Sequence, residues 1–167
     1  PEKKTSALLD VRYTSLRQPY DSYTSLTERP GYLRLYGQES LNSCYNVSLV
    51  ARRQQDRYVQ VETCVEFAPT CREQMAGLAN DDTGNFYLLV KTREEEFGSQ
   101  TLDLKKPAKL PDKGDHFDVE DVIPAISIPE EGPVYLRVTT TQEGFTQKIF
   151  YSLDGKDYQE LAEVPTN

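Results

Sequence analysis

Apolar and polar residues alternate with a period of two along most of the chain, which is typical of β-strands because successive side chains of a strand point to opposite faces. The clearest example is residues 58–67, where valine, threonine and phenylalanine fill every second position and glutamine and glutamate most of the others. Residues 134–139 and 145–153 repeat this alternation. Residues 86–90 are apolar on both faces, as in a strand covered on both sides. We therefore expect many strands and few helices.

Turn signals separate the expected strands. Residues 29–31 read Arg-Pro-Gly, residues 80–85 are rich in asparagine and aspartate, and Asp154-Gly155 offers the positive φ of a tight hairpin. Strands at this spacing predict an all-β fold, a two-sheet antiparallel β-sandwich. Residues 93–97 permit one short helical turn.

Two segments depart from the alternation. Residues 1–28 are polar and rich in serine, threonine and tyrosine, so we expect a linker or a segment that wraps onto a sandwich formed by residues 29–167. Residues 105–133 combine five prolines with many charges, and we expect a surface excursion with one short strand at 121–128. A length of 167 residues suits a single domain.

The net charge of the chain argues against one class of binding partner. The chain has 27 acidic and 19 basic residues, and its net charge of −8 repels nucleic acid. No apolar run approaches the ~18 residues of a membrane helix. The chain begins at Pro1 without a methionine or a secretory leader, and we expect a piece of a longer polypeptide. Its compartment, whether cytoplasmic, periplasmic or secreted, stays open.

The cysteines do not predict a disulfide framework. Cys44, Cys64 and Cys71 make an odd count and are sparse for a disulfide-stapled scaffold. We expect all three to be reduced, although a Cys64–Cys71 link stays open.

Catalytic and metal-binding patterns are weak. Glu94-Glu95-Glu96 is consecutive, so its carboxylates splay instead of facing each other across a substrate. His116 is the single histidine, and an exposed loop residue explains it better than a nucleophile's partner. The oxygen-rich loop at 80–85 could hold calcium, but a plain hairpin turn explains the same residues. We expect no catalytic residue and no cofactor.

Sugar binding is the more serious candidate, because aromatic rings stack on pyranose faces while polar groups bind the hydroxyls. The chain has 11 tyrosines and 6 phenylalanines but no tryptophan, which argues against a strong independent site. The candidate carbohydrate-binding residues are Tyr32, Tyr45, Tyr58 and Arg52. Arginines 34, 52 and 53 either present such a surface or pair across the sheet with Glu39, Glu62 or Glu66.

Residues 29–41 read RPGYLRLYGQESL and are followed by LVARRQ at 49–54. Together they resemble the C-terminal domain of family 43 glycoside hydrolases of the β-xylosidase and α-L-arabinofuranosidase type. The segments QMAGL at 74–78, VYLRV at 134–138 and FYSLDG at 150–155 continue the resemblance in the same order. It covers roughly residues 29–160.

The resemblance implies a concanavalin-A-like jelly roll. It also implies that the catalytic carboxylates lie on an N-terminal five-bladed propeller, outside this chain, on which the sandwich packs and whose pocket it helps to close in some members. A late segment of the family is not visible here, so the resemblance predicts that the last strands are missing and a sheet edge is open.

We therefore expect a non-catalytic accessory domain of a glycosidase that acts on xylan- or arabinan-type oligosaccharides. The alternative is a self-standing carbohydrate-binding module for such oligosaccharides. A third hypothesis is a purely structural domain that gives its parent stability and homo-oligomer contacts.

Overall fold

The computed structural model describes residues 9–40, 43, 45–82, 85–94, 98–108, 119–141 and 145–166. The chain forms two compact units, residues 1–55 and residues 56–167, which are described separately below. The elements within the described ranges are strands, apart from one short 3-10 helix. In those ranges no helix has the length and apolarity needed to cross a membrane.

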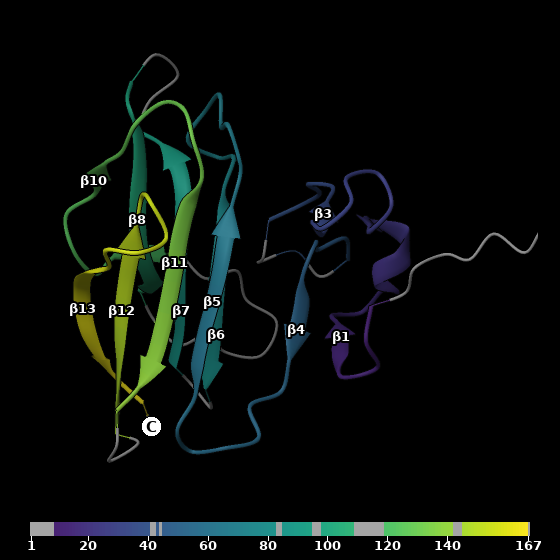
Figure 1. Ribbon diagram of the computed structural model, residues 1–167, viewed down its shortest axis with the longest axis horizontal. Helices are drawn as coiled ribbons and strands as arrows, with labels where there is room; N and C mark the ends of the chain where they lie inside the picture. The colour runs from purple at the N-terminus through teal and green to yellow at the C-terminus, as the bar shows by residue number, and fades with distance from the viewer. Residues whose placement is uncertain are drawn as a thin grey trace, which may run out of the picture. The chain divides into compact units, whose positions relative to one another are not determined.

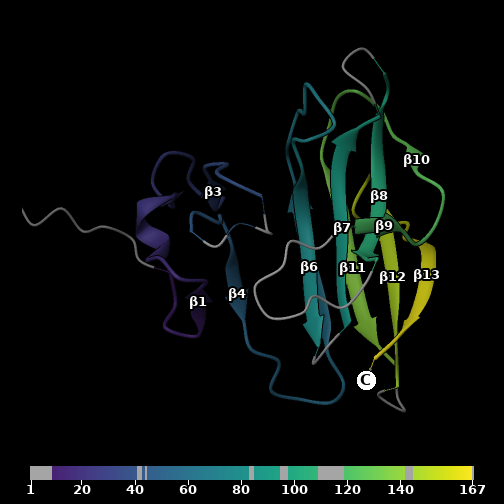
Figure 2. The same ribbon diagram turned by 180° about the vertical axis from the view of Figure 1, so that it is seen from behind.

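The second unit contains two antiparallel sheets, which lie face to face (Figure 1). One has the order β10-β8-β7-β6, and β9 also pairs with β8. Its strands are β6 (Ala76–Asp82), β7 (Asn85–Arg93), β8 (Gln100–Pro107), β9 (Val119–Asp121) and β10 (Ile126–Ser127). The other has the order β13-β12-β11-β5. Its strands are β5 (Gln60–Val65), β11 (Val134–Thr140), β12 (Thr146–Ser152) and β13 (Gln159–Pro165). Figure 2 shows the same pair of sheets from behind.

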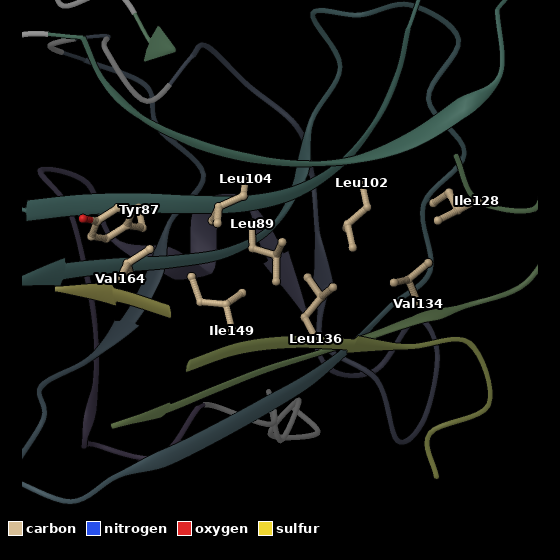
Figure 3. Close-up of a cluster of buried hydrophobic side chains, with 9 residues drawn as sticks. All are labelled: Tyr87, Leu89, Leu102, Leu104, Ile128, Val134, Leu136, Ile149 and Val164. Atoms are coloured by element: carbon tan, nitrogen blue, oxygen red, sulfur yellow. The ribbon is translucent and has the colours of Figure 1, made fainter. Parts of the chain in front are cut away.

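The core of the second unit lies between the two sheets (Figure 3). Alternate residues of β7, β8 and β11 point inward, as the period of two predicted. The buried cluster consists of Tyr87, Leu89, Leu102, Leu104, Ile128, Val134, Leu136, Ile149 and Val164. The predicted two-sheet antiparallel β-sandwich is confirmed.

Strand β7 is buried on both of its faces. Tyr87 and Leu89 point into the core, while the alternate residues Leu88 and Val90 are also buried. The sequence pattern predicted this double coverage, because only a strand shielded on both sides gains from apolar residues at every position.

Strand β8 corrects the prediction for residues 105–133. Instead of starting an irregular excursion at residue 105, the chain continues as a strand to Pro107. The strand expected at 121–128 is two shorter ones, β9 and β10, which both pair with β8. The sequence pattern missed β8 because its buried residues include Thr101, Asp103 and Lys105, whose polarity hides the alternation.

The hairpin between β12 and β13 forms where Asp154-Gly155 predicted a turn. Gly155 has a φ of +73°, a conformation that glycine adopts without steric cost. The Asp154 carboxylate accepts hydrogen bonds from the Ser152 hydroxyl at 2.8 Å and from the backbone amides of Lys156 at 2.8 Å and Asp157 at 2.9 Å. These bonds hold the turn closed.

The first unit contains two separate two-stranded antiparallel sheets. Strand β1 (Tyr13–Ser15) pairs with β4 (Val50–Arg52), and β2 (Thr24–Ser25) pairs with β3 (Arg34–Leu35). The 3-10 helix η1 (Tyr20–Ser22) lies between β1 and β2.

Residues 1–28 were expected to be a linker or a wrapping segment that ends before the sandwich. Tyr23 and Val47 are instead both 1% exposed in the first unit, and the Tyr23 hydroxyl donates to the Leu49 carbonyl at 2.7 Å. The compact units divide between Gln55 and Asp56, and not after residue 28. A polar Ser-Tyr-Thr context gave no sign that this tyrosine is buried.

Candidate functional site

The predicted sugar-binding residues fall in both units. Tyr32, Tyr45 and Arg52 belong to the first unit, whereas Tyr58 belongs to the second. Tyr45 and Tyr58 are 76% and 60% exposed, so both rings are accessible to a ligand. The Arg29 guanidinium lies 3.8 Å from the centre of the Tyr32 ring and covers one of its faces. The sugar-binding role of the four residues stays a prediction.

The strand partner of Arg52 is a tyrosine that is not among the candidate sugar-binding residues. Strand pairing places it directly opposite Tyr13, and residues opposite each other share a face of the sheet. It also contributes to the electrostatic environment of Asp10, whose pKa it lowers slightly.

Two of the charged residues expected to pair, Arg34 and Glu62, have partners that the sequence did not suggest. Arg34 Nε lies 3.3 Å from a Glu28 oxygen, and Arg137 Nε lies 2.6 Å from a Glu62 oxygen. Glu39 accepts hydrogen bonds from the Ser43 hydroxyl and the Asn46 amide. Glu62 and Arg137 are directly opposite each other on β5 and β11, and β11 falls in the segment 134–139 that the sequence predicted as a strand, but Arg137 was not among the arginines expected to pair.

A hollow of about 330 Å³ opens in the first unit between β1 and η1. Its walls are Tyr13, Thr14, Ser15, Pro19, Tyr20 and Asp21. The chain reverses between the two elements through Arg17, which has a φ of +67°. The Ser15 hydroxyl fixes this reversal by donating to the Gln18 carbonyl at 2.5 Å. The sequence analysis missed this site, whose signal is two tyrosines close together in a polar segment.

An ion pair lies next in sequence to the lining residue Tyr13. Arg12, next to Tyr13, holds Asp10 through Nε at 2.8 Å and Nη2 at 3.0 Å. Hydrogen bonds from Arg12 lower the pKa of Asp10 to about 2. Within the described ranges, no hydrogen-bond donor or cation contacts the Asp21 carboxylate. The lining of the hollow therefore includes two tyrosines and a carboxylate that no described residue contacts.

A buried charge cluster lies on β8 of the second unit. Lys105 Nζ is 3.1 Å from Asp103 Oδ2 and 2.5 Å from Asp121 Oδ1. Burial lowers the pKa of Lys105, but the hydrogen bonds that its ammonium donates to Asp121 and Asp103 outweigh this effect and raise that pKa overall. The other oxygen of Asp103 is buried without a hydrogen-bond partner in the described structure. The cluster keeps Lys105 charged, which suits a structural role.

Among the residues that the structure describes, the carboxyl groups with displaced pKa values have lowered values, a direction that opposes general acid catalysis. The Arg93 guanidinium, 2.6 Å away, lowers the pKa of Glu130, and the Ser43 hydroxyl lowers that of Glu39. Backbone amides lower the pKa of Asp154 to about 2. A glycosidase acid needs the opposite shift, since it must hold a proton near neutral pH.

The remaining sequence candidates give no metal or redox site that can be described. The calcium loop at 80–85 falls partly outside the described residues, as do Cys44 and His116. Cys64 and Cys71 are both free thiols, so the Cys64–Cys71 link left open by the sequence is absent. Among the residues that the structure places, no group of three potential ligands could hold a metal ion.

The sequence is similar to a known protein family and to characterised members of it. A family model described as the β-xylosidase C-terminal concanavalin A-like domain matches residues 5–166. The chain is 36% identical over 157 residues to the β-xylosidase of Bacillus subtilis, covering 92% of this chain and 28% of that protein. It is 32% identical over 145 residues to a non-reducing end α-L-arabinofuranosidase of Bacteroides ovatus, covering 84% of this chain and 25% of that protein.

Solved structures agree with these relatives. The crystal structure of a xylan β-1,4-xylosidase from Bacillus halodurans matches with a TM-score of 0.76 and 33% identity, covering 95% of this chain and 30% of that chain. The chain thus spans little more than a quarter of the length of the curated relatives named above.

Proposed function

This chain belongs to the family of β-xylosidase C-terminal concanavalin A-like domains, and from that we propose that it is a non-catalytic accessory domain of a glycosidase. In this role it packs on a catalytic propeller of the same parent polypeptide and supports it. The parent hydrolyses xylosyl or arabinosyl bonds in xylan- or arabinan-derived oligosaccharides.

The observation that carries the proposal is how small a part of each relative this chain matches. The family model covers residues 5–166 of this chain, yet the same region is only 28% of the Bacillus subtilis β-xylosidase. Most of the relative therefore lies outside the matched region, and the family description places that region at the C-terminal end.

The chemistry of the described carboxylates supports a non-catalytic role. Glu62, Asp103 and Glu130 each lie within ion-pair distance of a lysine or arginine. For Glu130, the hydrogen bonds from Arg93 lower the pKa, so this carboxylate lacks the proton that a departing sugar oxygen must receive.

Exposed apolar side chains around β3 offer a surface for the packing role. Tyr32, Leu33, Leu35 and Tyr36 are 41%, 39%, 46% and 48% exposed. Neighbouring exposed apolar residues of this kind are typical of surfaces that another protein part covers.

A pair of substitutions tests the proposal. Replacing Leu33 and Leu35 by aspartate in the whole parent should lower its thermal stability, because two charges enter the interface. The isolated chain with the same changes should melt as the wild type does, since both side chains are exposed. Tyr58→Asp, at an exposed apolar residue outside β3, is the matched control. It should change the melting temperature of neither the parent nor the isolated chain.

Activity measurements complete the test. The isolated chain should release no nitrophenol from aryl xylosides or arabinofuranosides, whereas the whole parent should. Release by the chain alone would refute the non-catalytic role. An unchanged thermal stability of the parent after the double substitution would refute packing through β3. The sugar-binding role of Tyr32, Tyr45, Tyr58 and Arg52, and homo-oligomer contacts, stay predictions.

A further inference from the structure

The hollow between β1 and η1 has no part in the accessory role proposed above. We propose that it is a binding site for a neutral sugar, with the Tyr13 and Tyr20 rings as its walls and the Asp21 carboxylate as its hydroxyl acceptor. The choice of a pentose-based oligosaccharide as ligand rests on the proposed function, but the site itself rests on the geometry.

The size of the hollow suits a sugar residue. Its volume of about 330 Å³ is at the lower end of the ~300–1,000 Å³ of pockets that hold small molecules. The lining residues that the structure describes all lie within residues 13–21 of the first unit.

The aromatic walls supply the apolar contact that a pyranose needs. Tyr13 is 37% exposed, and Tyr20 is half-buried in the adjacent 3-10 helix. A tyrosine presents a flat apolar ring together with a hydroxyl that can both donate and accept a hydrogen bond. Two such rings in one hollow match a ligand with apolar C–H faces and a rim of hydroxyl groups.

Asp21 supplies the polar specificity. An ionised carboxylate only accepts hydrogen bonds, and sugar hydroxyls donate them. Bonds to a charged acceptor are roughly twice as strong as neutral ones. Because no described residue occupies this carboxylate, its acceptor capacity remains available to a ligand.

The surrounding charges favour a neutral ligand over a cation. Aromatic rings beside a carboxylate also attract organic cations. Here, however, Arg12 precedes Tyr13 in the chain and Arg52 lies opposite Tyr13 in the sheet, so two positive charges lie on residues next to Tyr13. A ligand without net charge gains the ring contacts and avoids the repulsion of either arginine.

Titration of the 167-residue chain with xylotriose tests the site. We expect saturable binding in the millimolar range by calorimetry, and amide chemical-shift changes centred on residues 13–21. Tyr20→Ala should weaken binding at least about tenfold, which removal of one stacking surface can produce. Phe145→Ala, at an exposed aromatic residue of the second unit, is the matched control and should bind as the wild type does.

Two conservative variants keep the test decisive if Tyr20→Ala does not fold. Tyr20→Phe retains the ring and should bind within about threefold of the wild type, whereas Asp21→Asn loses the charged acceptor and should bind about tenfold more weakly. Tetramethylammonium serves as the probe for a cation site and should show no saturable shift at residues 13–21.

Several outcomes would overturn the inference. They are a flat xylotriose titration, shifts confined to residues 56–167, equal losses in Tyr20→Ala and Phe145→Ala, or tetramethylammonium binding that Asp21→Asn abolishes. None of these bears on the packing test with Leu33 and Leu35, so failure of the sugar site and failure of the accessory role are distinguishable.

Discussion

Gly155 and its neighbour Tyr135 show how one residue fixes the β12–β13 hairpin. A Cβ atom at Gly155 would lie 2.9 Å from Cε1 of the Tyr135 ring, and the φ of +73° already disfavours any other residue. Gly132 has a φ of +98° but nothing within 4 Å of such an atom. Substitutions at Gly132 and Gly155 therefore differ in steric overlap, because both positions have a positive φ but only Gly155 has a close neighbour.

We predict that Gly132→Ala costs about 1–2 kcal/mol of unfolding free energy, the cost of a positive φ for an L-residue. Gly155→Ala should cost more, by about 1–3 kcal/mol for the overlap with Tyr135. Urea denaturation of both variants checks this order, and equal losses would show that the Tyr135 ring moves aside freely.

Asp154 should make stability depend on pH. Backbone amides lower its folded pKa to about 2 from an unfolded value of 3.8, so its contribution is present above about pH 4 and is lost as the pH falls towards 2. Asp154→Asn should therefore melt below the wild type at neutral pH, and the gap should close between about pH 4 and pH 2. Melting temperatures across this range are the measurement, and a constant gap would contradict the assignment.

Strand β8 illustrates how a buried polar element is stabilised by charges from two strands. Lys105 is almost fully buried between Asp103 of the same strand and Asp121 of β9. Breaking a buried pair leaves an uncompensated charge, whereas replacing the whole pair with apolar residues often costs little.

Lys105→Met should accordingly destabilise the chain by about 3–5 kcal/mol, since Asp103 would remain buried without a cation. The double variant Lys105→Met with Asp103→Leu should recover most of that loss. Thermal unfolding of the two variants is the check. A double variant no more stable than the single one would show that the cluster contributes more than charge balance.

Elements could be predicted from the sequence where apolar residues decide the pairing. Val134 and Leu136 of β11, and both faces of β7, follow the period of two, and the sequence therefore predicts them. Strand β8 escaped prediction because Asp103 and Lys105 compensate each other through space, and a linear pattern does not show such pairs. The hollow at Tyr13 and Tyr20 escaped for the same reason, since a reversal at Arg17 brings the two together.

At the scale of the whole chain, the two units differ in the size of their cores. The nine buried residues of the main apolar cluster all lie in the second unit, whereas the first unit buries only Tyr23 and Val47 among the large apolar residues described. Since stability rises with buried apolar area, the second unit has the better prospect of folding alone.

We predict that residues 56–167 expressed alone unfold cooperatively, and that residues 1–55 alone do not. Circular dichroism during heating compares the two fragments. A second unit without a cooperative transition would show that its sandwich requires the first unit.

The strand order β13-β12-β11-β5 also has a kinetic consequence. Strand β5 at residues 60–65 can complete its ladder only with β11 at residues 134–140, so a ribosome must synthesise the intervening chain before the sheet can close. Contacts this distant in sequence slow folding, because the loop entropy is lost before the ladder compensates it. During that interval, the nascent polypeptide exposes an unpaired edge that a chaperone or a neighbouring nascent chain can capture.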